Sequence, residues 1–132
     1  LFIQMNLAAK FHKTTLKDRS AFPAKTLVRL ATRGGAEVLG LSDRIGSLEV
    51  GKAADLILIE TRSVNMFPIH DPYSVLVYSA NPSNVDSVWV NGKNLVFHKQ
   101  LVDHDVTLLI DQLRSAMREF SAQAERISQT LD

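Results

Sequence analysis

The chain has 132 residues, of which 45% are hydrophobic and 22% are charged, and it contains no cysteine. The apolar fraction excludes a disordered tail, and the absence of cysteine excludes a disulfide framework and any cysteine-based zinc site. The formal net charge is +1, which gives no general reason to expect nucleic-acid binding, and no apolar run is long enough to cross a bilayer.

The spacing of apolar residues predicts an amphipathic helix over residues 1–13. This helical spacing is already present at Leu1, the first residue of the chain. Its predicted inner face comprises Leu1, Phe2, Met5, Ala8, Ala9 and His12. No capping residue precedes this face. We therefore expect the chain to be a piece of a longer protein rather than one with a trimmed terminus.

Residues 23–40 predict two short helices. Pro23 suits a first helical turn, with Ser20 as a candidate cap. The Gly34-Gly35 pair is predicted to interrupt the helix and allow two short helices to approach closely, and Gly40 to end the second one. The pair is not a dinucleotide-binding fingerprint, because no strand precedes it.

The pattern then becomes extended. Residues 53–60 form a compact, partly β-branched apolar run, which predicts a buried strand. Residues 73–80 predict a short helix. Residues 85–90 and 95–98 predict a β-hairpin, because the intervening residues 91–94 contain Asn91-Gly92, a strong hairpin signal.

The last segment predicts a long helix. Its apolar stripe repeats every four and three residues and comprises Val106, Ile110, Leu113, Met117, Phe120, Ala124, Ile127 and Leu131. Asp103 or Asp105 can cap its start. The spacing also fits a coiled coil, but we expect the stripe to pack along the rest of the parent protein.

A search for chemistry finds no complete site. The four histidines form no metal-binding spacing, and His70-Asp71, flanked by prolines, is better explained as structural than as a dyad. There is no nucleophile elbow or P-loop, and Asp103 with Asp105 does not match a glycosidase pair. The nine basic residues against four acids in residues 1–52 are spread out without interleaved aromatics, which favours solvated helix faces over a nucleic-acid surface. We predict no catalytic and no metal-ligating residue here; substrate-binding residues stay unknown.

Several stretches resemble a known family. Residues 31–41 (ATRGGAEVLGL) and 45–56 (IGSLEVGKAADL) are similar to a signature near the C-terminus of metal-dependent amidohydrolases. Residues 68–72 with 76–78, and 85–93, resemble the subgroup of methylthioadenosine/S-adenosylhomocysteine deaminases and triazine (chloro)hydrolases. Residues 1–13 look like the helix after the last barrel strand of that subgroup.

The resemblance implies a (β/α)8 TIM-type barrel flanked by a small β-sandwich, so that this chain is an α+β fragment of both. Residues 1–42 would be the last barrel helices, 43–102 part of the sandwich, and 103–132 a closing helix. The metal ligands would lie upstream, and His70 and Asp71 would position a connection near the barrel.

The resemblance also implies an activity for the whole protein. A divalent metal, zinc or iron, would lower the pKa of a bound water that attacks a heterocyclic substrate. The reaction would deaminate a purine nucleoside or related heterocycle, or cleave a triazine C–Cl bond, and this chain alone would be inactive. We expect a cytoplasmic protein that needs the missing N-terminal barrel portion, with a homodimer as one arrangement and no nucleic-acid or membrane partner. The alternative is a stand-alone, non-enzymatic interaction module.

Overall fold

The structure, a computed structural model, describes residues 1–131, but not the side chains of Glu125 and of residues 128–131. Asp132, at the end of the predicted closing helix, and the Leu131 side chain of the predicted stripe lie outside this description. The chain divides into two compact units, Leu1–Gln100 and Leu101–Asp132, and each is described by itself.

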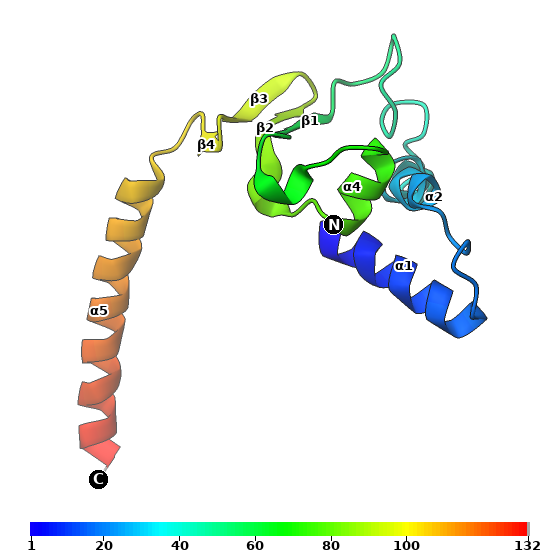
Figure 1. The fold of residues 1–132 in the computed structure, drawn as a ribbon. Helices are drawn as coiled ribbons and strands as arrows, with labels where there is room; N and C mark the ends of the chain where they lie inside the picture. Colours follow the sequence, from blue (N-terminus) through cyan, green and yellow to red (C-terminus); the bar gives the residue numbers. More distant parts are fainter. Residues whose placement is uncertain (132) are drawn as a thin grey trace. The chain divides into compact units, whose positions relative to one another are not determined.

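The first helix, α1, runs from Phe2 to Leu16, three residues beyond the predicted segment. Met5 and Ala9 are buried on its inner face, as the spacing predicts. They form a core cluster with residues of α2 (Ala24–Arg29) and α4 (Pro72–Tyr78); these are Ala24, Leu27 and Val77. Figure 1 shows α1, α2 and α4 meeting beside the N-terminus. Met5 and Val77, 72 positions apart in the sequence, therefore share one small apolar core.

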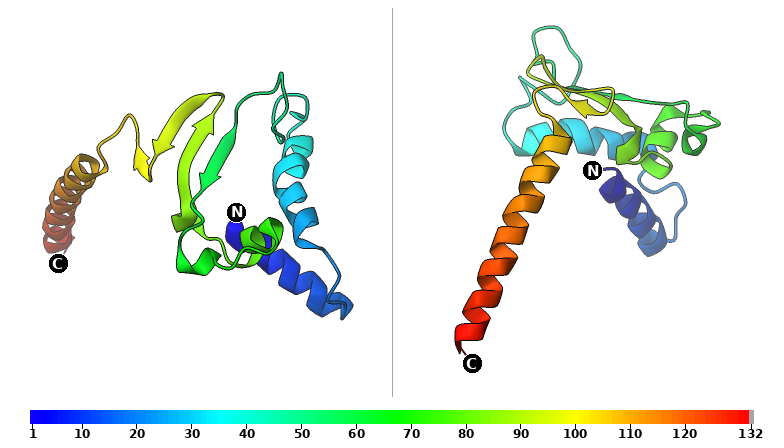
Figure 2. Two further views of the ribbon diagram at one scale, coloured as in Figure 1. Left: turned by 45° about the horizontal axis from the view of Figure 1, so that its top comes forward. Right: turned by 90° about the vertical axis from the view of Figure 1, so that its left-hand side faces the viewer.

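The glycine pair does not interrupt its helix, which corrects the prediction of two short helices. The α2 helix continues through a π-helical segment, η1 (Leu30–Gly34), into α3 (Gly35–Val38), and Figure 2 shows one continuous rod. A glycine inside a helix lowers its stability by only about 1 kcal/mol relative to alanine. The helix can therefore continue through the pair, with the wider π turn accommodating it. Gly40 has a φ of 67° and ends the helix as predicted.

The start of α2 differs from the prediction in one detail. Pro23 is its N-cap, but Ser20 makes no capping bond. Instead, Ser20 donates from its backbone N and its Oγ to Asp18 Oδ1, at 2.8 and 2.6 Å. Ser20 therefore closes the connecting turn before the helix rather than the helix itself.

The close approach that the sequence assigns to Gly34-Gly35 occurs at Gly46. A Cβ built on Gly46 would lie 2.7 Å from the Ala36 Cβ, and the residue has a φ of 91°. Next to Gly35 there is open space. The loop after α3 therefore folds back against the helix at a point where only glycine fits.

The sheet has four strands in the order β1-β2-β3-β4. They are β1 (Leu56–Ile59), β2 (Val85–Val90), β3 (Lys93–Phe97) and β4 (Gln100–Leu101). The β1–β2 and β2–β3 pairs are antiparallel, which confirms the predicted hairpin. Strand β1 lies within the predicted segment but is not buried here, since Ile57 and Leu58 are each 50% exposed. Because successive residues of a strand point to opposite faces of the sheet, Ile57 and Leu58 leave one half-exposed apolar side chain on each face at this edge.

Between β1 and β2 lie η2 (Val64–Met66), α4 and η3 (Pro82–Asn84). Met66, Val75 and Ala80 form a second core cluster. Beside it, Asn84 is almost fully buried and accepts hydrogen bonds at Oδ1 from Asn65 Nδ2 (2.9 Å) and the Asn81 backbone N (3.0 Å). Its buried amide therefore fixes the entry into β2.

The second unit contains a single long helix, α5 (Val106–Leu131). Asp105 Oδ1 accepts from the backbone N of Thr107 (2.8 Å) and of Leu108 (3.2 Å), so Asp105, one of the two predicted candidates, caps the helix. Because the unit contains no second helix, the exposed side chains of the stripe from Val106 to Phe120 have no other helix inside it to pack on. Within the described residues, no helix combines the length and hydropathy that a membrane span requires.

Candidate functional site

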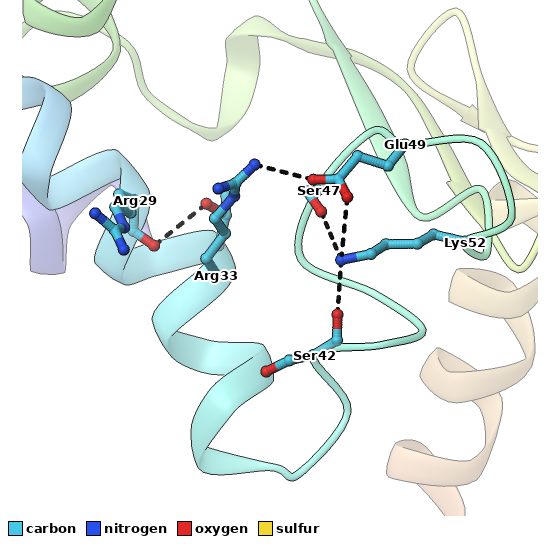
Figure 3. Close-up of polar contacts among 7 residues, drawn as sticks. Arg29, Arg33, Ser42, Ser47, Glu49 and Lys52 are labelled. Atoms are coloured by element: carbon cyan, nitrogen blue, oxygen red, sulfur yellow. Dashed lines mark hydrogen bonds and ion pairs between the residues drawn. The ribbon is translucent and has the colours of Figure 1, made fainter.

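A charged polar cluster surrounds Lys52, in the loop after α3 (Figure 3). Its Nζ donates to the Ser42 carbonyl oxygen at 2.6 Å and to Ser47 Oγ at 2.8 Å, and lies 3.8 Å from Glu49 Oε2. These partners come from three points of one loop. Gly51, directly before Lys52, forms a turn with a φ of 95°. This turn directs the Lys52 ammonium back over the loop.

The cluster reaches the helix through Arg33. Its Nη2 donates to Glu49 Oε1 at 3.0 Å, while both side chains remain about half exposed. A hydrogen bond from Ser47, with the charges of Lys52 and Arg33, holds the pKa of the Glu49 carboxyl below its ordinary value of 4.5. Glu49 is therefore ionised at neutral pH and unsuited to proton transfer there.

A pocket of about 260 Å³ lies against this cluster, and its lining adds Ala36, Glu37 and Ile45 to the residues already named. Arg33 and Lys52 bring two positive charges to it, and Glu37 and Glu49 two negative ones. Because the cations already have partners in the loop, the arrangement joins the loop to the helix and offers no free nucleophile. This cluster was not predicted from the sequence; its signal was Ser47 and Glu49 between Gly46 and Gly51, with Lys52 directly after Gly51.

A second set brings together a serine, a histidine and an aspartate at the β3–β4 turn. His98 Nδ1 lies 3.3 Å from Asp86, and Ser87 Oγ donates to Asp86 Oδ2 at 2.8 Å. The Ser87 bond, with a smaller contribution from His98, lowers the pKa of the Asp86 carboxyl. Ser87 is fully buried and its hydroxyl faces the carboxylate rather than the imidazole ring. The set therefore holds the turn and lacks the geometry of a catalytic triad.

The remaining histidines lie apart. His12 stacks on the Phe22 ring with centroids 4.0 Å apart, while His70 and His104 are exposed on loops. Among the residues that the structure describes, no group of three His, Cys, Asp or Glu side chains could hold a metal ion.

The predicted dyad position His70-Asp71 has a clear local role. Asp71 is the N-cap of α4 and accepts from the backbone N of Tyr73 (3.3 Å) and of Ser74 (3.0 Å), and from Ser74 Oγ (2.5 Å). The Ser74 hydroxyl is the main cause of a lowered pKa for Asp71. With Pro72 at the first position, this cap starts the helix that carries Val77 into the core.

Comparison with known proteins places these residues in context. Residues 1–95 match the model of the amidohydrolase family. The chain is 38% identical over 118 residues to a 5-methylthioadenosine/S-adenosylhomocysteine deaminase of Syntrophobacter fumaroxidans, covering 89% of this chain and 27% of that protein. It is also 38% identical over 120 residues to a 5'-deoxyadenosine deaminase of Methanobrevibacter smithii, covering 90% and 28% of the two chains.

Solved structures give the same grouping. An adenosine deaminase from Xanthomonas campestris with bound zinc superposes with a TM-score of 0.82 at 36% identity, over 92% of this chain and 28% of that one. The atrazine chlorohydrolase TrzN from Arthrobacter aurescens, complexed with zinc, gives 0.77 at 32%, over 87% and 26%. The chain thus spans about a quarter of the length of the relatives it matches.

Proposed function

Because this chain belongs to the amidohydrolase family, we propose that it is the C-terminal part of a metal-dependent hydrolase that deaminates an adenine nucleoside. The relatives named above are deaminases of such nucleosides and a triazine hydrolase. The identity extends over nine-tenths of the chain, which supports a shared role for the whole stretch.

The observation that carries the proposal is a second apolar face on α1. Ile3, Leu7 and Phe11 lie one helical turn apart and are each at least 60% exposed, whereas Met5 and Ala9 on the other face are buried. A helix that is apolar on both faces suits a position between two layers. In the proposal, the exposed face packs on a (β/α)8 barrel formed by the rest of the protein.

The same reasoning assigns the segments. Residues 1–42 would be the last helices of the barrel, residues 43–102 part of a small β-sandwich completed by another part of the protein, and residues 103–132 a closing helix. The half-exposed strand β1 supports the second assignment, because Ile57 on one face of the sheet and Leu58 on the other are each 50% exposed. The third is supported by α5, because its stripe from Val106 to Phe120 has no second helix within its own unit to pack on.

The metal, zinc or iron, is proposed to bind outside this stretch. The described residues do not fit a divalent metal, since no three ligand side chains converge. We accordingly propose that no catalytic residue lies here and that the isolated chain is inactive. Its contribution would be to support the barrel and sandwich around a site formed elsewhere.

Two further parts of the proposal concern the protein's location in the cell and its oligomeric state. A cytoplasmic location fits the absence of cysteine. A homodimer is proposed for the whole protein and can be measured by its molar mass in solution.

The test is a substrate comparison on the whole purified protein. Ammonia release from 5'-methylthioadenosine, S-adenosylhomocysteine and 5'-deoxyadenosine should exceed chloride release from atrazine. The chlorohydrolase is the second candidate function, favoured by the superposition on TrzN, and chloride release as the main reaction would support it. Failure to hydrolyse either class would favour the stand-alone module and overturn the proposal.

A further inference from the structure

The tip of the β2–β3 hairpin combines a reactive sequence with a specific set of contacts. Asn91 and Gly92 form the turn, with φ values of 50° and 78°. Positive φ at both central residues is the type I′ geometry of a two-residue hairpin. Asn91 is exposed, and it is the one asparagine of the sequence that precedes a glycine.

Asparagine followed by glycine can rearrange without an enzyme. The backbone nitrogen of the glycine attacks the side-chain amide carbon of the asparagine, and ammonia leaves as a five-membered imide closes. Water then opens the imide to aspartate or to isoaspartate. Glycine has no side chain to hinder the ring closure and permits the backbone rotation that closure requires.

In the folded chain the backbone nitrogens of Asn91 and Gly92 both donate hydrogen bonds to residues just before β1. The Gly92 N, which would be the attacking atom, donates to the Ala54 carbonyl oxygen at 3.1 Å. The Asn91 N donates to Asp55 Oδ1 at 2.6 Å. The rigid turn and these two bonds hold the backbone away from the rotation that ring closure requires.

We propose that Asn91 is a site of spontaneous deamidation whose rate is set by detachment of the hairpin tip from residues 54 and 55. The product places a new carboxylate beside Asp55, and isoaspartate also adds a methylene to the backbone. A two-residue turn cannot absorb that extra length without losing its strand register. Modification would therefore release the tip from β1 irreversibly.

The experiment incubates the whole chain in mildly alkaline buffer and follows each asparagine by peptide mass mapping, with the same chain in urea as reference. Asn91 should convert in urea about tenfold faster, or more, than in native buffer, because the hydrogen bonds at the tip must break first. Asn94, in the same hairpin but followed by leucine, is the internal control and should stay unmodified.

The decisive variant is Asp55→Ala, which removes one of the two acceptors. It should raise the native rate at Asn91 about fivefold and leave the rate in urea unchanged. Asp55→Asn, which keeps a neutral acceptor, should have a native rate between those of the wild type and Asp55→Ala, and circular dichroism serves to check that each variant is folded. The proposal would be overturned if both variants deamidated at Asn91 in native buffer at the wild-type rate. It would also be overturned if the wild type deamidated in native buffer as fast as in urea.

Discussion

Replacing Gly46 with alanine should destabilise the first unit by about 2–6 kcal/mol. Two terms contribute. The φ of 91° costs a residue with a side chain about 1–3 kcal/mol. The new methyl would lie 2.7 Å from the Ala36 Cβ, 3.2 Å from the Thr32 carbonyl oxygen and 3.3 Å from the Arg33 Cα, and such overpacking costs a further 1–3 kcal/mol or so. Since the helix backbone cannot give way easily, the loop must move.

Two other glycines separate these terms. Gly40 has a φ of 67° but open space around it, so Gly40→Ala should cost only about 1–2 kcal/mol from the backbone. Gly35 lies in a helix with open space, so Gly35→Ala should be neutral or stabilising by up to about 1 kcal/mol. The assay is urea unfolding of the three variants beside the wild type. A loss for Gly46→Ala no larger than that for Gly40→Ala would refute the close-approach argument.

Three more outcomes follow from the geometry. Asp71→Ala should lower stability by about 1 kcal/mol through loss of the α4 cap, measured by thermal unfolding, whereas Ser74→Ala keeps both backbone bonds and should cost less; equal losses would contradict the cap. Folding lowers the pKa values of Glu49 and Asp71 from 4.5 and 3.8. The stability that these two carboxylates give the folded chain is therefore complete above their unfolded pKa values and is lost as the pH falls through the lower folded ones. Unfolding midpoints should thus stay level from neutral pH to about 5 and fall below about 4, and a fall that begins above pH 6 would argue against these carboxylates as the cause. Finally, the purified chain should retain no stoichiometric zinc or iron after dialysis, and elemental analysis that finds one ion per chain would require a site among His12, His70 and His104.

Local signals in the sequence were sufficient for several elements. The Asn91-Gly92 turn and Gly40 after α3 each impose a backbone geometry that few alternatives satisfy. The inner face of α1 was likewise predictable, because Met5 and Ala9 follow the helical period.

Other features depend on contacts between distant residues. The continuous helix through Gly34-Gly35 requires a π turn, which no local pattern indicates. The Lys52 cluster requires the loop to fold back until its ammonium reaches Ser42, ten residues earlier. Strand β1 has the composition of a buried strand, yet its exposure depends on what covers the sheet rather than on its own residues.

The central claim is that this chain completes a hydrolase whose chemistry lies in a preceding barrel. The most direct measurement is the coding sequence upstream of Leu1. We predict roughly 300 further residues, because the 118 matched residues are 27% of the length of the Syntrophobacter fumaroxidans deaminase. They should include the metal ligands that the resemblance to amidohydrolases implies, a His-x-His pair far upstream and an aspartate shortly before Leu1. A start codon immediately before Leu1 would contradict it.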